Sequence, residues 1–330
     1  MRLVTLLFLC VCATSFAQVK VGIIGLDTSH SPAFIKLLNS DNPRPEHRGF
    51  RIVAAYPYGS QAIESSAKRI PGYIEEATKY GVEIVASIAE LLQKVDCVLL
   101  ETNDGNMHLQ QAAEVIESGK PFFLDKPVAA TLPQAIAIFM LAKEHSTPFF
   151  SSSALRFTSN NQAIRAGKYG KILGADYYSP HHHEPTHTDF TWYGIHGVEP
   201  LFTVMGTGCQ TVTRISGDGS DVVVGLWNDG RIGSFRALLK DKADYGGTVF
   251  CEKGIAAAGG YDGYGALLAE ILKFFTTGQP PVAAEETLEI FTFMEASNES
   301  KRLEGKPVSM AKTYRKAAKK AKKLLEGLKN

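Results

Sequence analysis

The chain has few cysteines, little net charge and no long apolar run. Its five cysteines are too scattered for a disulfide framework or a cysteine-rich metal cluster. Two of them, Cys10 and Cys12, lie in the N-terminal segment described next, and Cys97, Cys209 and Cys251 remain. The formal net charge of +1 gives no reason to expect nucleic acid as a partner.

Residues 1–17 have the pattern of a secretory signal peptide. Arg2 gives a positive start, an apolar run covers Leu3–Val11, and Ser15–Ala17 is a small-x-small cleavage site before Gln18. The run is too short to span a membrane comfortably, so we expect no stable membrane insertion. The segment has neither a twin arginine nor a lipobox, which favours Sec-type export to the periplasm or the medium.

The stretch Val19–Phe34 reads V-K-V-G-I-I-G-L-D-T-S-H-S-P-A-F, a buried strand that turns into a helix. A dinucleotide-binding βα unit begins in this way, with the fingerprint G-x-G-x-x-G. Gly22 lies in the strand and Gly25 holds the first fingerprint position, but Asp27 and His30 replace the second and third glycines. Asp27 could cap the helix, and its charge would oppose a phosphate. Together with His108, Asp27 and His30 could instead bind something other than NAD.

The second predicted strand, residues 50–56, lacks the acidic residue that holds the ribose hydroxyls of NAD. No carboxylate occurs between it and Glu64. Gly59 and Ser60 could tolerate the 2′-phosphate of NADP or form a plain turn. The choice between NAD and NADP therefore stays open.

Strands and helices alternate through the first half of the chain, which predicts a doubly wound parallel sheet. Glycine-punctuated strands in the second half predict an α+β domain with an open, mostly antiparallel sheet. The expected division is a signal peptide at 1–17, a Rossmann-like nucleotide-binding domain at 18–150 and an α+β substrate and oligomerisation domain at 151–330. Lysines alternate with alanine and leucine over 311–328, which predicts a solvated amphipathic helix.

The expected first-half strands are 19–24, 50–56, 81–85, 95–101, 122–124 and 149–151, and the expected helices are 32–39, 63–80, 88–93, 109–118 and 131–145. The expected second-half strands are 172–178, 211–215, 221–227, 231–238 and 248–251.

Several motifs in order resemble the Gfo/Idh/MocA oxidoreductases, which include glucose–fructose oxidoreductase and inositol dehydrogenase. They are G-I-I-G-L, a strand and turn ending in His108, and G-K-P-F-F-L-D-K-P-V-A, in which D-K-P stands where the family has E-K-P. The segments 167–175, 193–201 and 267–308 resemble the family's entry strand, catalytic helix and closing helices. The resemblance covers nearly all of the chain after residue 17.

The resemblance implies hydride transfer between a bound NAD or NADP and a sugar or polyol. It implies that Lys126 anchors the substrate oxygen and that His196 takes the hydroxyl proton. It also implies a homo-oligomer, because the open sheet often forms dimers in this family. The implied cofactor-binding residues are Gly22, Gly25, Asp27, His30, Thr102, His108 and Asp125. The implied substrate-binding residues are Arg156, His183, Trp192 and Glu199, although Arg156 could equally be a salt-bridge residue.

One position departs from the family's catalytic helix. Trp192 stands where the family has an aspartate one turn before the catalytic histidine, and Asp189 or Glu199 could substitute for it. The nearby run H-H-H-E-P-T-H, residues 181–187, is dense enough in imidazole to consider a divalent metal. Pro180 and Pro185 favour a loop there, so we expect a substrate-binding loop and assign no metal.

Two other functions remain open. The chain could be an exported lyase or hydrolase that acts on keto-sugars through Lys126 and His196 without a nicotinamide. It could also be a carbohydrate-binding protein without catalysis, because a fold does not fix a function.

Overall fold

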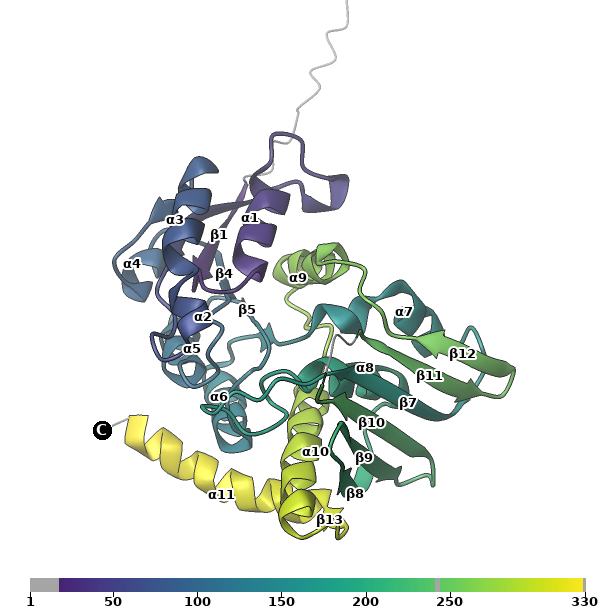
Figure 1. Cartoon of the computed structure of the whole chain (residues 1–330). Helices are drawn as coiled ribbons and strands as arrows, with labels where there is room; N and C mark the ends of the chain where they lie inside the picture. Colours follow the sequence, from purple (N-terminus) through teal and green to yellow (C-terminus); the bar gives the residue numbers. More distant parts are fainter. Residues whose placement is uncertain (1–17, 241–243, 329–330) are drawn as a thin grey trace, which may run out of the picture.

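The computed structural model describes residues 18–240 and 244–328, so the predicted signal peptide lies outside the described residues. Two sheets lie side by side, each with its own helices (Figure 1). Among the described residues, none of the helices combines the length and the apolar character that a membrane span requires.

The first sheet confirms the predicted doubly wound parallel fold. Its six strands are parallel and run in the order β3-β2-β1-β4-β5-β6. The order reverses between β1 and β4, which is where open α/β sheets bind ligands. The strands are β1 (Val19–Ile24), β2 (Phe50–Tyr56), β3 (Glu83–Ile84), β4 (Cys97–Leu100), β5 (Phe122–Leu124) and β6 (Phe149–Phe150). The helices are α1 (His30–Asn39), α2 (Glu64–Ala67), α3 (Ile70–Lys79), α4 (Ile88–Leu92), α5 (His108–Glu117) and α6 (Leu132–His145), with a 3₁₀ turn η1 at Pro45–His47.

The second sheet confirms the open, mostly antiparallel arrangement. Its order is β12-β11-β7-β10-β9-β8-β13, and only β7 and β10 pair in parallel. The strands are β7 (Ile172–Pro180), β8 (Cys209–Ser216), β9 (Ser220–Trp227), β10 (Ile232–Leu238), β11 (Gly246–Cys251), β12 (Gly254–Ala258) and β13 (Val308–Ser309). The helices of this half are η2 (Ala154–Phe157, 3₁₀), α7 (Ser159–Arg165), α8 (Ile195–Met205), α9 (Gly265–Thr277), α10 (Ala284–Arg302) and α11 (Met310–Leu328).

Two differences between the local predictions and the structure have a clear physical cause. The single helix expected over 63–80 is split into α2 and α3, and Pro71 lies in the first turn of α3, where its missing N–H leaves no helical bond unmade. Strand β12 was not predicted, because G-I-A-A-A has no alternating pattern. It forms because it pairs with β11.

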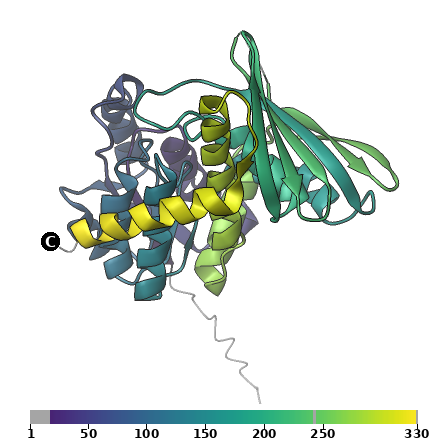
Figure 2. The same cartoon turned by 90° about the horizontal axis from the view of Figure 1, so that it is seen from below.

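Two helices late in the chain pack against the first domain. Leu267, Leu268 and Ile271 of α9 share a buried core with Val21 and Phe34. Helix α11 lies across α6 (Figure 2) and is amphipathic as predicted, with a buried stripe of Ala317, Ala321 and Leu325. The predicted division at residue 150 thus separates the two sheets but not these helices.

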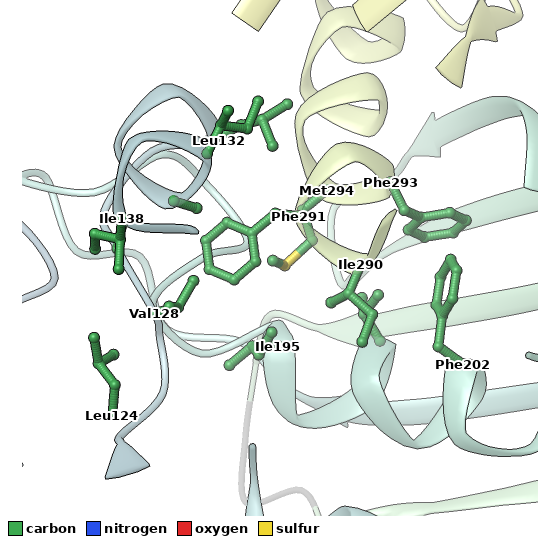
Figure 3. Packing of buried hydrophobic residues seen from close by; sticks show 14 of the residues in the cluster. Leu124, Val128, Leu132, Ile138, Ile195, Phe202, Ile290, Phe291, Phe293 and Met294 are labelled. Atoms are coloured by element: carbon green, nitrogen blue, oxygen red, sulfur yellow. The ribbon is translucent and has the colours of Figure 1, made fainter. Parts of the chain in front are cut away.

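Helix α10 joins the two halves through an apolar core. Phe291 and Met294 face Val128 and Leu132 of the first domain, while Phe293 packs on Phe202 of α8 (Figure 3). Each large apolar side chain buried in this way contributes about 1.5–3 kcal/mol. This core holds α8 in place relative to the carboxyl end of β5, and those two elements carry the predicted catalytic residues.

Candidate active site

A cleft of about 400 Å³ opens at the carboxyl ends of the first sheet's strands. Residues from both domains line it, so the packing of α10 and α8 determines its shape. The lining includes Thr28, Ser29, His30, Arg69, Asn103 and Lys126 from the first domain, and Ser153, His182, Trp192, Tyr193, His196, Tyr245, Tyr261 and Tyr264 from the rest of the chain.

The two glycines predicted to bind a cofactor have different roles. Gly25 has φ +92°, and a Cβ there would lie 2.6 Å from the backbone of Thr102, so only glycine fits the turn after β1. Gly22 lies inside β1, where a Cβ would meet Leu91 at 2.6 Å. Gly22 therefore allows helix α4 to pack on the strand, and its predicted cofactor contact is wrong. Thr102 is fully buried against Gly25 and does not line the cleft.

Asp27, at the second fingerprint position, lies beneath the cleft and outside its lining. It is fully buried, and its Oδ1 accepts a hydrogen bond from the Asn103 N–H at 3.1 Å. A Cβ on Gly59 would lie 2.0 Å from its Oδ2, so the loop after β2 closes over the carboxyl group. Burial raises the pKa of Asp27 to about 7, against the opposing effect of the Asn103 N–H.

Asp27 does not cap helix α1 as predicted. Thr28 Oγ1 accepts from the His30 N–H at 3.1 Å, while Asp27 joins the loops that follow β1, β2 and β4.

His30, at the third fingerprint position, meets two carboxylates at the centre of the sheet edge. Its Nδ1 lies 2.8 Å from Asp125 Oδ2 and 3.7 Å from Glu101 Oε2, and its ring packs on Tyr264 at 4.5 Å. Glu101 was not predicted as a site residue. Its signal in the sequence is a single carboxylate directly after the apolar strand V-L-L, at the edge where ligands bind.

His108 does not join this cluster, so the predicted Asp27/His30/His108 group does not form. His108 is fully buried; its Nε2 lies 2.6 Å from the Thr102 carbonyl and its Nδ1 lies 3.0 Å from that of Pro127. Burial lowers its pKa, and the carbonyl oxygens around the ring oppose that effect. It braces two loops and does not reach the cleft.

Lys126 and His196 lie in the same cleft, as the sequence predicted. Lys126 follows β5, and its N–H donates to Asp125 Oδ1 at 2.7 Å. His196 is on the first turn of α8, with Nδ1 2.9 Å from Ser153 Oγ. Burial lowers the pKa of His196 well below its ordinary value, and the charges of Lys126 and His30 lower it further. The imidazole is therefore neutral at neutral pH and free to accept a proton.

Arg156 and Glu199 do not contact the cleft, so their predicted substrate role is wrong. Arg156 is fully buried, with Nε 2.7 Å from Glu199 Oε1 and Nη1 2.6 Å from Glu286 Oε1. The other oxygen of Glu199 accepts from the Ser153 N–H at 2.7 Å. Since Ser153 contacts His196, this buried network positions the imidazole from behind.

The histidines of the 181–187 loop do not converge on a common point. His181 Nε2 lies 3.0 Å from Asp189, and His187 Nε2 accepts from the Gly105 N–H at 3.1 Å. His183 is exposed and outside the lining, which corrects its predicted substrate contact, whereas its neighbour His182 lines the cleft.

Trp192 lines the cleft, as its predicted substrate contact requires, and packs on His187 at 4.8 Å between ring centres. Asp189, which pairs with His181 and Arg214, does not replace the carboxylate missing at Trp192. Ser153 hydrogen-bonds to the His196 ring, and the rings of Tyr193 and Tyr245 pack against it.

Comparison with known proteins supports the resemblance seen in the sequence. Residues 19–152 match the family model GFO_IDH_MocA, described as an oxidoreductase family with an NAD-binding Rossmann fold. An uncharacterized oxidoreductase of Escherichia coli K12, YhhX, is 27% identical over 146 residues, which are 40% of this chain and 42% of that protein. The match thus spans less than half of that relative.

Solved structures extend the similarity of fold to both domains. Scyllo-inositol dehydrogenase from Lactobacillus casei, solved with NAD(H) and scyllo-inositol, superposes with a TM-score of 0.70 at 16% identity, covering 89% of this chain and 99% of that one. Myo-inositol dehydrogenase from the same organism, solved with NAD(H) and myo-inositol, gives 0.69 at 16% identity, covering 88% and 96%. At this identity the likeness shows the fold alone.

Proposed function

We propose that this chain, whose residues 19–152 match the Gfo/Idh/MocA oxidoreductase family model, transfers hydride between NAD or NADP and a sugar or polyol. The observation that carries the proposal is the meeting of Lys126 and His196, from different domains, in one cleft at the carboxyl ends of the parallel strands. Inositol dehydrogenases with the same fold bind NAD(H) and a polyol, which supports the choice of substrate class.

The two residues divide the proton chemistry between them. The Lys126 ammonium binds the substrate oxygen and stabilises negative charge on it as the proton leaves. Ser153 Oγ already accepts from the Leu155 N–H and can accept from Nδ1–H of His196 as well. That tautomer leaves Nε2 of His196 unprotonated, so this nitrogen takes the hydroxyl proton. The rings of Trp192 and Tyr245 line the same cleft.

The cleft has groups that fit a dinucleotide. Ser29 lines it at the start of α1, where a helix N-terminus favours phosphate, and Arg69 adds a positive charge. The carboxyl of Asp27 lies below this lining and is about half neutral at pH 7, which limits its repulsion of phosphate. A nicotinamide bound here would supply the hydride acceptor. Strand β2 ends at Tyr56 without an acidic residue for the ribose, so both NAD and NADP need testing.

The alternative is elimination or hydrolysis of a keto-sugar by Lys126 and His196 without hydride transfer. The observation that favours it is the Asp27 carboxyl, which occupies the position of the fingerprint's second glycine and hydrogen-bonds across to Asn103. Proton transfer by the same two residues is sufficient for that chemistry.

The test begins with fluorescence titration by NADH and by NADPH, after the purified protein has been checked for retained nicotinamide. Saturable binding, followed by polyol-dependent reduction of NAD or NADP, supports the proposal. Lys126→Met and His196→Asn should each lower turnover about 10²–10⁴-fold. The matched changes Lys143→Met and His145→Asn, on the exposed end of α6, should leave it unchanged. Absence of nicotinamide binding together with keto-sugar turnover would favour the alternative. If both Lys126→Met and His196→Asn kept full activity, the assignment of the site would be refuted.

We also propose export through residues 1–17. Expression in a bacterial host with a Sec pathway should give a mature protein that begins at Gln18 in the periplasm or the medium. An intact N-terminus in the cytoplasm would contradict this proposal.

We further propose a homo-oligomer formed through the outer face of the second sheet. This face exposes apolar side chains on several strands, among them Ile215 (66% exposed), Ile232 (56%) and Ile255 (70%). Light scattering should show a multimer, and Ile232→Lys should shift it toward the monomer. A monomer at micromolar concentration would refute the proposal.

A further inference from the structure

Three neighbouring strands are each followed by a residue whose side chain can bind a metal ion. His30 follows β1, Glu101 follows β4 and Asp125 follows β5, and these strands are adjacent in the sheet. One ligand atom from each residue lies within 4.8 Å of the other two. The parallel register places Glu101 beside Asp125, and the turn after β1 brings His30, on the first turn of α1, to the same point.

The facing atoms of the cluster have no hydrogen-bond partner among the described residues. Both carboxylate oxygens of Glu101 are unpartnered, although the residue is fully buried. His30 Nδ1 and Asp125 Oδ2 lie 2.8 Å apart, which is an ion-pair distance. The unpaired buried carboxylate of Glu101 is costly, and a cation held between it, Asp125 and His30 would offset that cost.

The spacing of the cluster is close to that of a coordination sphere. Ligand atoms about 2.1 Å from a common metal ion lie about 3.0–3.4 Å apart for octahedral to tetrahedral angles. The separations from His30 Nδ1, 2.8 Å to Asp125 and 3.7 Å to Glu101, lie on either side of that range. An ion at this point would also offset the mutual repulsion of the two buried carboxylates.

We propose that His30, Glu101 and Asp125 bind a divalent transition-metal ion at the base of the cleft. One imidazole and two carboxylates form a ligand set that suits Zn²⁺ or Mn²⁺. The His30 side chain is 8% exposed and lines the cleft together with Lys126, so the cluster lies directly beneath the cleft. The ion would bind substrate oxygens beside the ammonium as a second positive centre. This site is additional to the proposed hydride transfer and does not depend on it.

The competing explanation is a proton shared by His30 and Asp125, whose Nδ1 and Oδ2 lie 2.8 Å apart, beside a neutral Glu101. Burial and the neighbouring Asp125 raise the pKa of Glu101 well above its ordinary value, so a neutral carboxylic acid could form there. Such a pair would need no metal. The experiment has to distinguish the two states directly.

Tag-free, EDTA-treated protein is titrated calorimetrically with ZnCl₂ and with MnCl₂, in the absence of substrate and nicotinamide. We expect one ion per chain, with at least about 100-fold weaker binding in Glu101→Gln and Asp125→Asn. Glu295→Gln makes the same change in a half-buried carboxylate on α10 and should stay within threefold of the wild type. No saturable binding by the wild type, or equal binding by the variants, would overturn the proposal in favour of the shared proton.

Electron spin-echo spectroscopy of the Mn²⁺-loaded wild type keeps the proposal testable if the variants do not fold. We expect coupling to a single imidazole nitrogen, from His30. Absence of any nitrogen coupling would overturn the assignment. Because neither measurement uses turnover, failure of this site is distinguishable from failure of the proposed oxidoreductase activity.

Discussion

Replacing Asp27 by asparagine should stabilise the protein, and increasingly so as the pH rises. Oδ1 of an asparagine could still accept from the Asn103 N–H, as Asp27 does at 3.1 Å. The carboxylate that burial makes unfavourable would be gone. The same loops would remain joined, so the variant isolates the effect of the charge.

The magnitude follows from the raised pKa. Burial raises the pKa of Asp27 from an ordinary 3.8 to about 7, so the folded state holds this proton more tightly than the unfolded state does. The carboxyl therefore costs nothing below pH 3.8 and destabilises the fold progressively as the pH rises to about 7. The full cost is about 4 kcal/mol, of which more than half develops between pH 5 and pH 8.

Urea denaturation of wild type and variant at pH 5 and pH 8 measures this difference. The gain in unfolding free energy of Asp27→Asn over wild type should be larger at pH 8 by about 2–3 kcal/mol. Asp41→Asn, at an exposed position, should change stability by less than about 0.5 kcal/mol at either pH. An equal gain at both pH values would show that Asp27 is charged throughout, and the reasoning would fail.

Three further outcomes follow from the same contacts. Gly59→Ala should destabilise the wild type, because its Cβ would lie 2.0 Å from the Asp27 carboxyl, but it should be tolerated together with Asp27→Ala. Additive changes of the urea midpoint in the double-mutant cycle would refute this. Glu199→Gln should cost about 3–5 kcal/mol in urea, because it leaves a buried guanidinium short of one charge partner, whereas Glu299→Gln in an exposed pair should cost under about 1 kcal/mol. Turnover that depends on neutral His196 should rise with pH through a value below 6.5 and then stay level; a rise above pH 7 would contradict the lowered pKa.

The fold was predictable because it depends on patterns that repeat along the sequence. Alternating apolar strands and helices determine a parallel sheet, and right-handed crossovers leave few ways to order it. Failures occurred where pairing overrides local preference, as in β12, or where one proline divides a helix, as at Pro71. The placement of α9 and α11 on the first domain required contacts between residues far apart in the sequence, which no local pattern shows.

The site was predictable only in part. Lys126 and His196 were found because each lies in a short motif at a strand or helix end. Arg156 and Glu199 were misassigned because a sequence does not show whether two opposite charges pair with each other or face a ligand. Their burial in one network with Ser153 gives them a positioning role behind His196.

The same limit explains Glu101, which the sequence analysis missed. A carboxylate that follows an apolar strand is unremarkable until the sheet order is known. Once β1, β4 and β5 are neighbours, it faces His30 and Asp125. His30 replaces a fingerprint glycine, and a glycine there could not have supplied the imidazole. The two departures from the dinucleotide fingerprint therefore belong to two separate local structures. Asp27 makes a contact between loops, and His30 lies in a cluster with Glu101 and Asp125. This explains them better than the decay of a single motif does.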